Sequence, residues 1–108
     1  MTTFQTIKLG DVVLVKGGKR LPLGCALTKD KTAHPYIRAR DIGGGKITFD
    51  DPVYVDEETF PFIKNYIVNK DDVCITIVGA NVGDIGFTPA YLDGANLTEN
   101  AVKLFPKN

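Results

Sequence analysis

The chain has 108 residues, of which 44% are hydrophobic and 24% charged, and its 13 basic residues balance its 13 acidic residues. These values predict one soluble globular domain and exclude a disordered chain, which needs fewer apolar residues and a larger net charge. The longest apolar run, at residues 73–78, is far shorter than the roughly 20 residues of a membrane span, and the N-terminus lacks the features of a signal peptide. We therefore expect a cytosolic protein.

Seven short runs of β-branched and aromatic residues lie between glycines and prolines. Each run predicts a strand. The run at 73–78 is the strongest, because it is apolar apart from Thr76, and its pattern predicts burial on both faces. The predicted strands span residues 12–15, 36–40, 46–49, 53–55, 73–78, 84–88 and 101–105.

One segment has helical features. Asp56 is a suitable N-cap, two acids follow it where the helix dipole favours them, and three apolar residues then recur at helical spacing. These features predict a short helix over residues 57–66. The fold class is therefore predicted to be α+β, a small mostly-β domain with one short helix, and residues 1–108 are predicted to form a single domain.

The balanced total charge hides an asymmetry along the chain. Residues 16–40 hold seven basic residues against one acid, a net charge of +6, whereas residues 41–72 hold eight acids against three lysines, a net charge of −5. A basic stretch on one face can bind a polyanion such as DNA, although most surface charges only solvate the protein. The candidate DNA contacts are Lys16, Lys19, Arg20, Lys29, Lys31, His34, Arg38, Arg40 and Asn81.

Two pairs among these candidates suggest distinct roles. Lys19 and Arg20 follow a Gly-Gly turn, so we expect them to be exposed and to contact phosphates. Arg38 and Arg40 would share one face of a strand about 7 Å apart, where arginine can hold phosphates or read guanine edges. The competing expectation is that acids such as Asp41 hold these two arginines and that they serve stability.

Other motifs favour structural interpretations. The glycine-rich segment 79–86 follows a strand but lacks the Gly-Lys-Ser/Thr of a phosphate loop and leads into Phe-Thr-Pro, so it predicts a hairpin. Cys25 and Cys74 stand alone, which predicts two small buried thiols and no metal site. The acid pairs at 50–51 and 71–72 flank turns, so we interpret them as loop residues. No nucleophile and base come together in the sequence pattern, so we expect no enzyme.

Four segments, in order, resemble the target recognition domain of type I restriction-modification specificity subunits. They read Lys-Leu-Gly-Asp-Val at 8–12, Tyr-Ile-Arg-Ala-Arg-Asp-Ile at 36–42, Asp-Val-Cys-Ile-Thr-Ile-Val-Gly-Ala-Asn-Val-Gly at 72–83 and Asn-Leu-Thr-Glu-Asn-Ala at 96–101. The resemblance implies that the domain selects a sequence in double-stranded DNA, while partner methyltransferase and restriction subunits perform the chemistry. S-adenosylmethionine, ATP and Mg²⁺ would belong to those partners, and this chain would hold no cofactor.

The chain departs from that family in its length. A typical specificity subunit has two such domains separated by long helices, so we expect an incomplete domain here, with exposed strand edges that favour self-association. The alternative is a truncated interaction or inhibitory module that binds restriction-modification subunits without binding DNA. A small hydrolase is the third possibility, and no set of site residues supports it.

Overall fold

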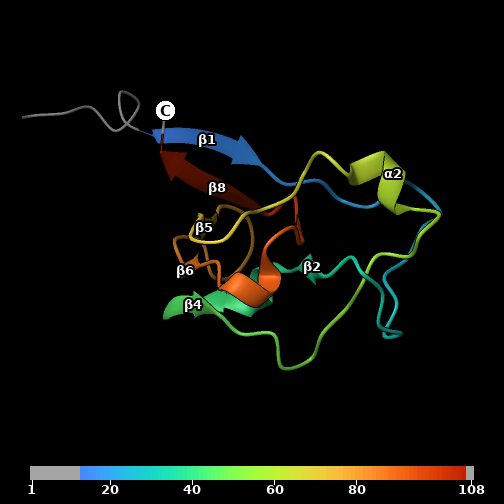
Figure 1. The fold of residues 1–108 in the computed structure, drawn as a ribbon. Coiled ribbons are helices and arrows are strands. Elements are labelled where there is room, and N and C mark those ends of the chain that lie inside the picture. Colours follow the sequence, from blue (N-terminus) through green and yellow to red (C-terminus); the bar gives the residue numbers. More distant parts are fainter. Residues whose placement is uncertain (1–12, 107–108) are drawn as a thin grey trace, which may run out of the picture.

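The computed structural model describes residues 13–106, which form a six-stranded sheet and a separate two-stranded parallel sheet (Figure 1). The small sheet pairs β2 (Tyr36–Ile37) with β7 (Asn96–Leu97). The large sheet is antiparallel apart from its parallel β4–β6 pair. Its strands, in spatial order, are β1 (Val13–Gly17), β8 (Ala101–Pro106), β5 (Val73–Thr76), β6 (Ile85–Phe87), β4 (Gly45–Ile47) and β3 (Ile42–Gly43).

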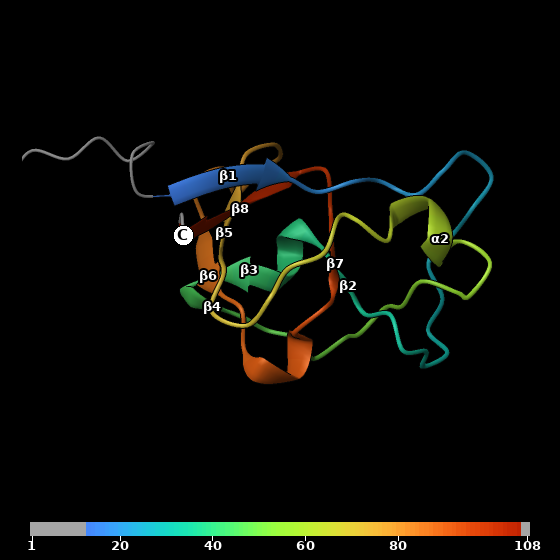
Figure 2. The same cartoon turned by 45° about the horizontal axis from the view of Figure 1, so that its top comes forward.

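Three short helical segments accompany these strands, namely the α-helix α2 (Phe60–Ile63) and the 3₁₀ segments Ala39–Asp41 and Ala90–Leu92. Strands outnumber helices, which confirms the predicted α+β, mostly-β class with one short α-helix. Figures 1 and 2 show the large sheet at one end of the molecule and α2 at the other, beside the connection between β1 and β2. None of the helices in residues 13–106 has the length and apolar character that a bilayer crossing requires.

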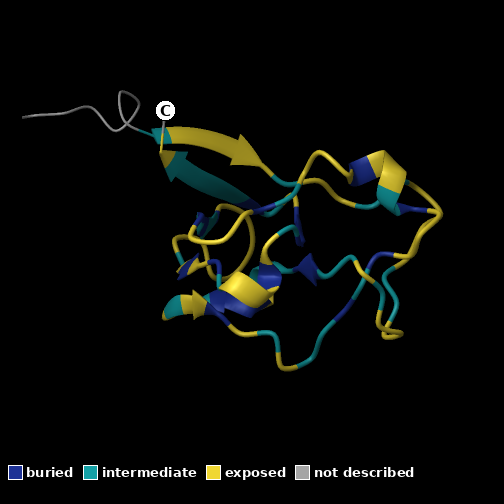
Figure 3. Ribbon diagram, viewed as in Figure 1, coloured by how far each residue is buried: buried dark blue, intermediate teal, exposed yellow. Residues whose placement is uncertain are grey.

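The inner face of the large sheet covers a fully enclosed core. On β5 the side chains of Cys74 and Thr76 are buried, whereas Val73 and Ile75 on the opposite face are only partly buried. The prediction that this strand is buried on both faces was therefore wrong, because no layer of the described chain covers its outer face. Figure 3 shows that the edge strand β1 is exposed along most of its length.

The hydrophobic residues form two clusters, one for each end of the molecule. The larger cluster packs against the large sheet. The smaller cluster includes a residue of α2, and the connection between β1 and β2 packs against it. Each fully buried aliphatic side chain contributes on the order of 1.5–3 kcal/mol. The smaller cluster consists of Tyr36, Val53, Val55 and Ile63, with Leu21, Leu27 and Phe60 packed against it.

The predicted helix over 57–66 is wrong in its extent, because α2 covers only four residues. The Asp56 side chain accepts the Thr59 N–H at 2.7 Å and closes a turn before the helix begins. At the other end, the side-chain amide of buried Asn96 donates to the Ile63 carbonyl at 2.9 Å. The same carbonyl accepts the Tyr66 N–H at 3.0 Å, a bond to the third residue along the chain rather than the fourth, so the α-helical pattern does not continue past Ile63.

Most predicted strands are present with altered bounds. The segment 53–55 forms no regular strand, since Tyr54 makes only isolated bridges to Thr28 and Pro35. The segment 79–86 connects β5 to antiparallel β6 and confirms the predicted hairpin. The motif at 8–12 and the first residue of the strand predicted at 12–15 lie outside the described residues.

Candidate nucleic-acid interface

The basic residues predicted as DNA contacts fall into two groups. Lys16, Lys19 and Arg20 lie at the end of β1 and in the loop after it, and all three are exposed. The segment from Lys29 to Arg40 forms the second group, and the acidic middle of the chain folds against it. Acids neutralise most cations of the second group, whereas the first group has no acidic partner within residues 13–106.

Arg38 belongs to the second group and is part of the framework. Its Nε and Nη2 each lie 3.2 Å from a carboxylate oxygen of Asp41, and its backbone N–H donates to the same carboxylate at 2.9 Å. The Asp41 side chain is 2% exposed and that of Arg38 is 20% exposed. A buried carboxylate needs such a partner, because desolvation penalises an unpaired charge.

The prediction that Arg38 and Arg40 share one face of a strand was wrong. Strand β2 ends at Ile37, and a 3₁₀ turn at Ala39–Asp41 follows. The turn forms because the Asp41 carboxylate reaches back to the Arg38 N–H and guanidinium, which breaks the extended alternation. The competing expectation, that Asp41 holds Arg38, is confirmed.

Asp51 binds two further cations of the second group. Its carboxylate lies 2.6 Å from Lys29 Nζ and 3.4 Å from Arg40 Nη1. The hydrogen bond and charge of Lys29, followed by the charge of Arg40, lower the pKa of Asp51 below its usual value. Exposed pairs of this kind contribute little to stability, but they reduce the positive charge that this segment presents to solvent.

His34 is packed rather than free. Its ring stacks on Phe60 with centroids 3.7 Å apart, and its Nε2 lies 3.0 Å from a Glu57 carboxylate oxygen. Lys31 is exposed and makes no hydrogen bond or ion pair within residues 13–106. Asn81 is exposed in the β5–β6 turn, where its carbonyl accepts the Asp84 N–H.

The cations of the first group form no ion pair within residues 13–106, and hydrogen bonds hold the backbone at Lys19 in position. The Lys19 N–H donates to Leu97 O at 2.9 Å, and the Tyr36 hydroxyl donates to Lys19 O at 3.0 Å. Burial raises the pKa of Tyr36, so that hydroxyl keeps the proton it donates. A Cβ at Gly18 would lie 2.0 Å from Thr98 O, so only glycine lets the chain pass this close to the end of β7.

Two hollows lie between residues 16–23 and residues 62–67. The hollow nearer α2, which we call the tip hollow, has a volume of about 540 Å³ and is lined by residues 19–23, Phe62 and Ile63. The second, which we call the strand hollow, has a volume of about 320 Å³. None of the residues lining either hollow is acidic. The strand hollow is lined by Lys16, Gly17, Asn65, Tyr66, Ile67, Leu97 and Lys103.

Aromatic side chains accompany the cations at both hollows. Lys19 Nζ lies 5.9 Å from the centre of the Tyr66 ring, and Lys16 Nζ lies 5.7 Å from the centre of the Phe105 ring. Phe62 is 70% exposed beside the tip hollow. We call the surface made by Lys16, Lys19, Arg20, Phe62 and Tyr66 the cationic face.

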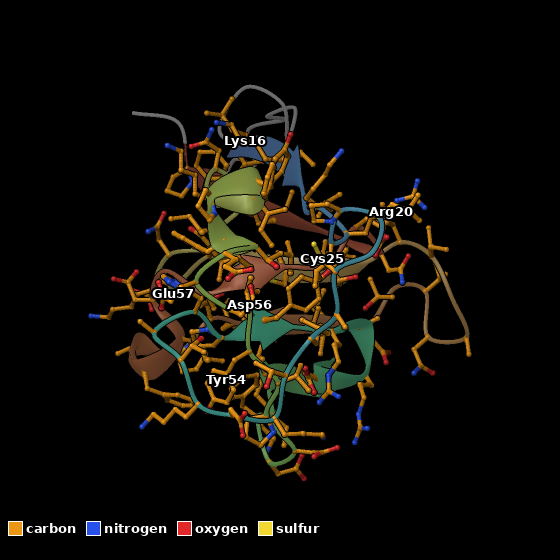
Figure 4. The ribbon with its side chains drawn as sticks, turned by 90° about the vertical axis from the view of Figure 1, so that its right-hand side faces the viewer. Lys16, Arg20, Cys25, Tyr54, Asp56 and Glu57 are labelled. Atoms are coloured by element: carbon orange, nitrogen blue, oxygen red, sulfur yellow. The ribbon has the colours of Figure 1, made fainter. Side chains whose placement is uncertain are left out.

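Asp56 and Glu57, two of the three acids that precede α2, lie apart from the labelled cations in Figure 4. In Figure 4, Lys16 and Arg20 are in the upper half of the view, whereas Asp56 and Glu57 lie lower. Asp56 is engaged in the turn before α2 and Glu57 contacts His34. Cations, aromatic rings and hollows without acids together suit an anionic ligand that carries flat rings.

Sequence reasoning missed both aromatic residues of the cationic face. Phe62 and Tyr66 lie four residues apart, and within an expected helix 57–66 they were not considered as contacts. The sequence did contain a signal for this face, namely two aromatic residues four positions apart with Lys64 between them.

The prediction of a buried thiol was wrong for Cys25, which is exposed, whereas Cys74 is buried as predicted. Within the described residues, no three His, Cys, Asp or Glu side chains come together as a metal site.

Comparison with known proteins gives one result. A family model described as the type I restriction modification DNA specificity domain matches residues 1–108. No curated protein matches the chain. The family match covers the whole sequence, including every segment that carries the resemblance noted above. The chain therefore belongs to the family of type I restriction-modification DNA specificity domains.

Proposed function

We propose that this DNA specificity domain binds double-stranded DNA through its cationic face. The observation that carries the proposal is the contrast between the two basic groups. Lys16, Lys19 and Arg20 have no acidic partner within residues 13–106, whereas Asp41 and Asp51 neutralise Arg38, Arg40 and Lys29. Unpaired cations are the groups that release counterions from the phosphate backbone.

In this mechanism the cations position the domain and other side chains specify the sequence. Lys16, Lys19 and Arg20 contact phosphates, and their fixed backbone sets the register of the duplex. Side chains on the adjoining loops, including Asn81 in the β5–β6 turn, would then reach base edges. Arg38 acts indirectly, by holding the turn after β2.

Catalysis is assigned to partner proteins in this proposal. The methyltransferase and restriction subunits of the same system would transfer the methyl group and cut the DNA in the cytoplasm. Transfer of a methyl group from S-adenosylmethionine by the pure chain would contradict this assignment.

The edge of the large sheet supports the expected self-association. Within the described chain, β1 pairs only with β8, and both Leu14 and Val15 are exposed. An open, apolar edge strand favours pairing with a further strand. Sedimentation at increasing protein concentration should show a growing dimer fraction, and a monomer at all concentrations would contradict this expectation.

The experiment compares two triple variants of the full chain in binding to a mixed-sequence duplex by fluorescence anisotropy. One variant replaces Lys16, Lys19 and Arg20 with Ala. The matched control replaces Lys31, Lys46 and Lys70, which are likewise exposed and unpaired within residues 13–106 but do not belong to the cationic face. Circular dichroism confirms that each variant is folded.

The first variant should bind every duplex more weakly, and the slope of log K against log salt should fall by about 2.7, or about 0.9 for each lost phosphate contact. The control variant should retain the slope of the parent. Equal losses in the two variants would show that total charge, rather than this face, determines binding, and would refute the proposal.

A further inference from the structure

We propose that the tip hollow receives one unstacked nucleotide of the bound DNA, with its base against Phe62 and its phosphate on Lys19 and Arg20. This inference rests on the proposed function, because it assumes that the cationic face meets DNA. It adds a contact with a base to the contacts with phosphates. An intact duplex could bind the cations through its phosphates without using the tip hollow.

The size and the lining of the tip hollow both fit a nucleotide. Its volume of about 540 Å³ lies within the range of about 300–1,000 Å³ typical of small-ligand sites. Lys19 and Arg20 provide positive charge, while Leu21, Pro22 and Phe62 provide an apolar wall. A nucleotide has the same division, with a charged phosphate at one end and a flat ring at the other.

The exposed aromatic ring favours a base over an aliphatic group. Phe62 is 70% exposed although it adjoins an apolar wall, and Leu23 on the same hollow is fully exposed. Stacking of a base on such a ring tolerates any sequence, because every base has a π-face. The absence of acidic lining residues removes the repulsion that a phosphate would otherwise meet.

The walls of the tip hollow are held from outside it. The Lys19 backbone is fixed by Leu97 and Tyr36, and the carbonyl of Ile63 is fixed by Asn96. A turn at residues 22–25, closed by the Cys25 N–H on Pro22 O at 3.0 Å, shapes the outer rim. Such a preformed site loses less conformational freedom when a ligand enters.

The test uses two duplexes of the same sequence, one fully paired and one with a single unpaired 2-aminopurine. The parent chain should bind the second duplex at least about five-fold more tightly, and the fluorescence of 2-aminopurine should fall as it stacks. Phe62→Ala should abolish both effects, so that the two duplexes bind with equal affinity, and Phe62→Tyr should restore the difference. Tyr91→Ala removes another exposed aromatic ring and serves as the matched control, with no change expected.

The outcomes separate this inference from the proposed function. Equal binding of the two duplexes, or a preference that survives Phe62→Ala, would overturn the nucleotide site while DNA binding by the cationic face stands. Failure of the parent to bind either duplex would overturn both. Loss of the preference in Tyr91→Ala as well would assign it to general aromatic exposure and would also overturn the site.

Discussion

Replacing Arg38 with methionine should destabilise the domain without weakening its intrinsic affinity for DNA. The substitution keeps a long side chain but removes both guanidinium bonds to Asp41, which is buried. The carboxylate then retains only the backbone N–H of residue 38 as its partner in this turn. The variant therefore leaves a buried charge without its cation.

The size of the effect follows from burial. Breaking a buried ion pair from one side costs about 3–5 kcal/mol. The Arg38 side chain is 20% exposed, so water reaches part of the pair, and we expect a loss near the lower end, about 3 kcal/mol. A small domain has a free energy of unfolding of roughly 5–15 kcal/mol, so this is a large share of the total. The melting temperature should fall by roughly 10 °C or more.

Urea unfolding of the parent, Arg38→Met, Asp41→Asn and the double variant measures the coupling between the two residues. The double variant should be more stable than Arg38→Met, because it removes the charge that the single variant leaves unpaired. At a temperature where Arg38→Met is folded, its affinity for a duplex should match that of the parent. A loss below about 1 kcal/mol, or a DNA affinity that falls with stability unchanged, would refute the structural role of Arg38.

Cys25 should react with a disulfide reagent in the native protein, whereas Cys74 should react only after unfolding, because burial encloses the Cys74 thiol and raises its pKa. Rapid reaction of both thiols in the native protein would contradict this prediction. Gly18→Ala should lower the free energy of unfolding by about 2 kcal/mol or more through a clash with Thr98 O, whereas Gly17→Ala meets open space and should not, as urea titration can show. Asp51→Asn should reduce the free energy of unfolding slightly near pH 7 but not in acid. Lys29 lowers the pKa of Asp51 in the folded state. The ion pair therefore stabilises the fold above the usual carboxyl pKa of about 3.9, and this stabilisation disappears as the pH falls through the lower pKa of the folded state. A loss that persists at low pH would contradict that assignment.

The sequence predicted elements well where local chemistry determines them. The β-branched run at 73–78 contains β5, which ends at Thr76, and the glycines at 79 and 83 have positive φ in the hairpin that follows it. These features depend on neighbouring residues alone, so a single sequence contains the information. The family resemblance similarly rested on short local segments.

Three failures of the sequence predictions depended on partners distant in sequence. The helix over 57–66 stops after four residues while Asn96, more than 30 positions away, holds the Ile63 carbonyl. Lys29 was predicted to contact DNA because the sequence does not show that Asp51, 22 positions away, forms an ion pair with it. The tip hollow brings Phe62 beside residues 19–23, and no local pattern contains that pairing.

Titration of the ¹⁵N-labelled chain with duplex DNA tests the central claim most directly, because it locates the contact without a substitution. Backbone amide signals within residues 16–23 and 62–66 should shift, whereas those of residues 28–41, whose cations are largely neutralised, should stay in place. Shifts confined to residues 28–41, or to the outer face of the large sheet, would contradict the claim.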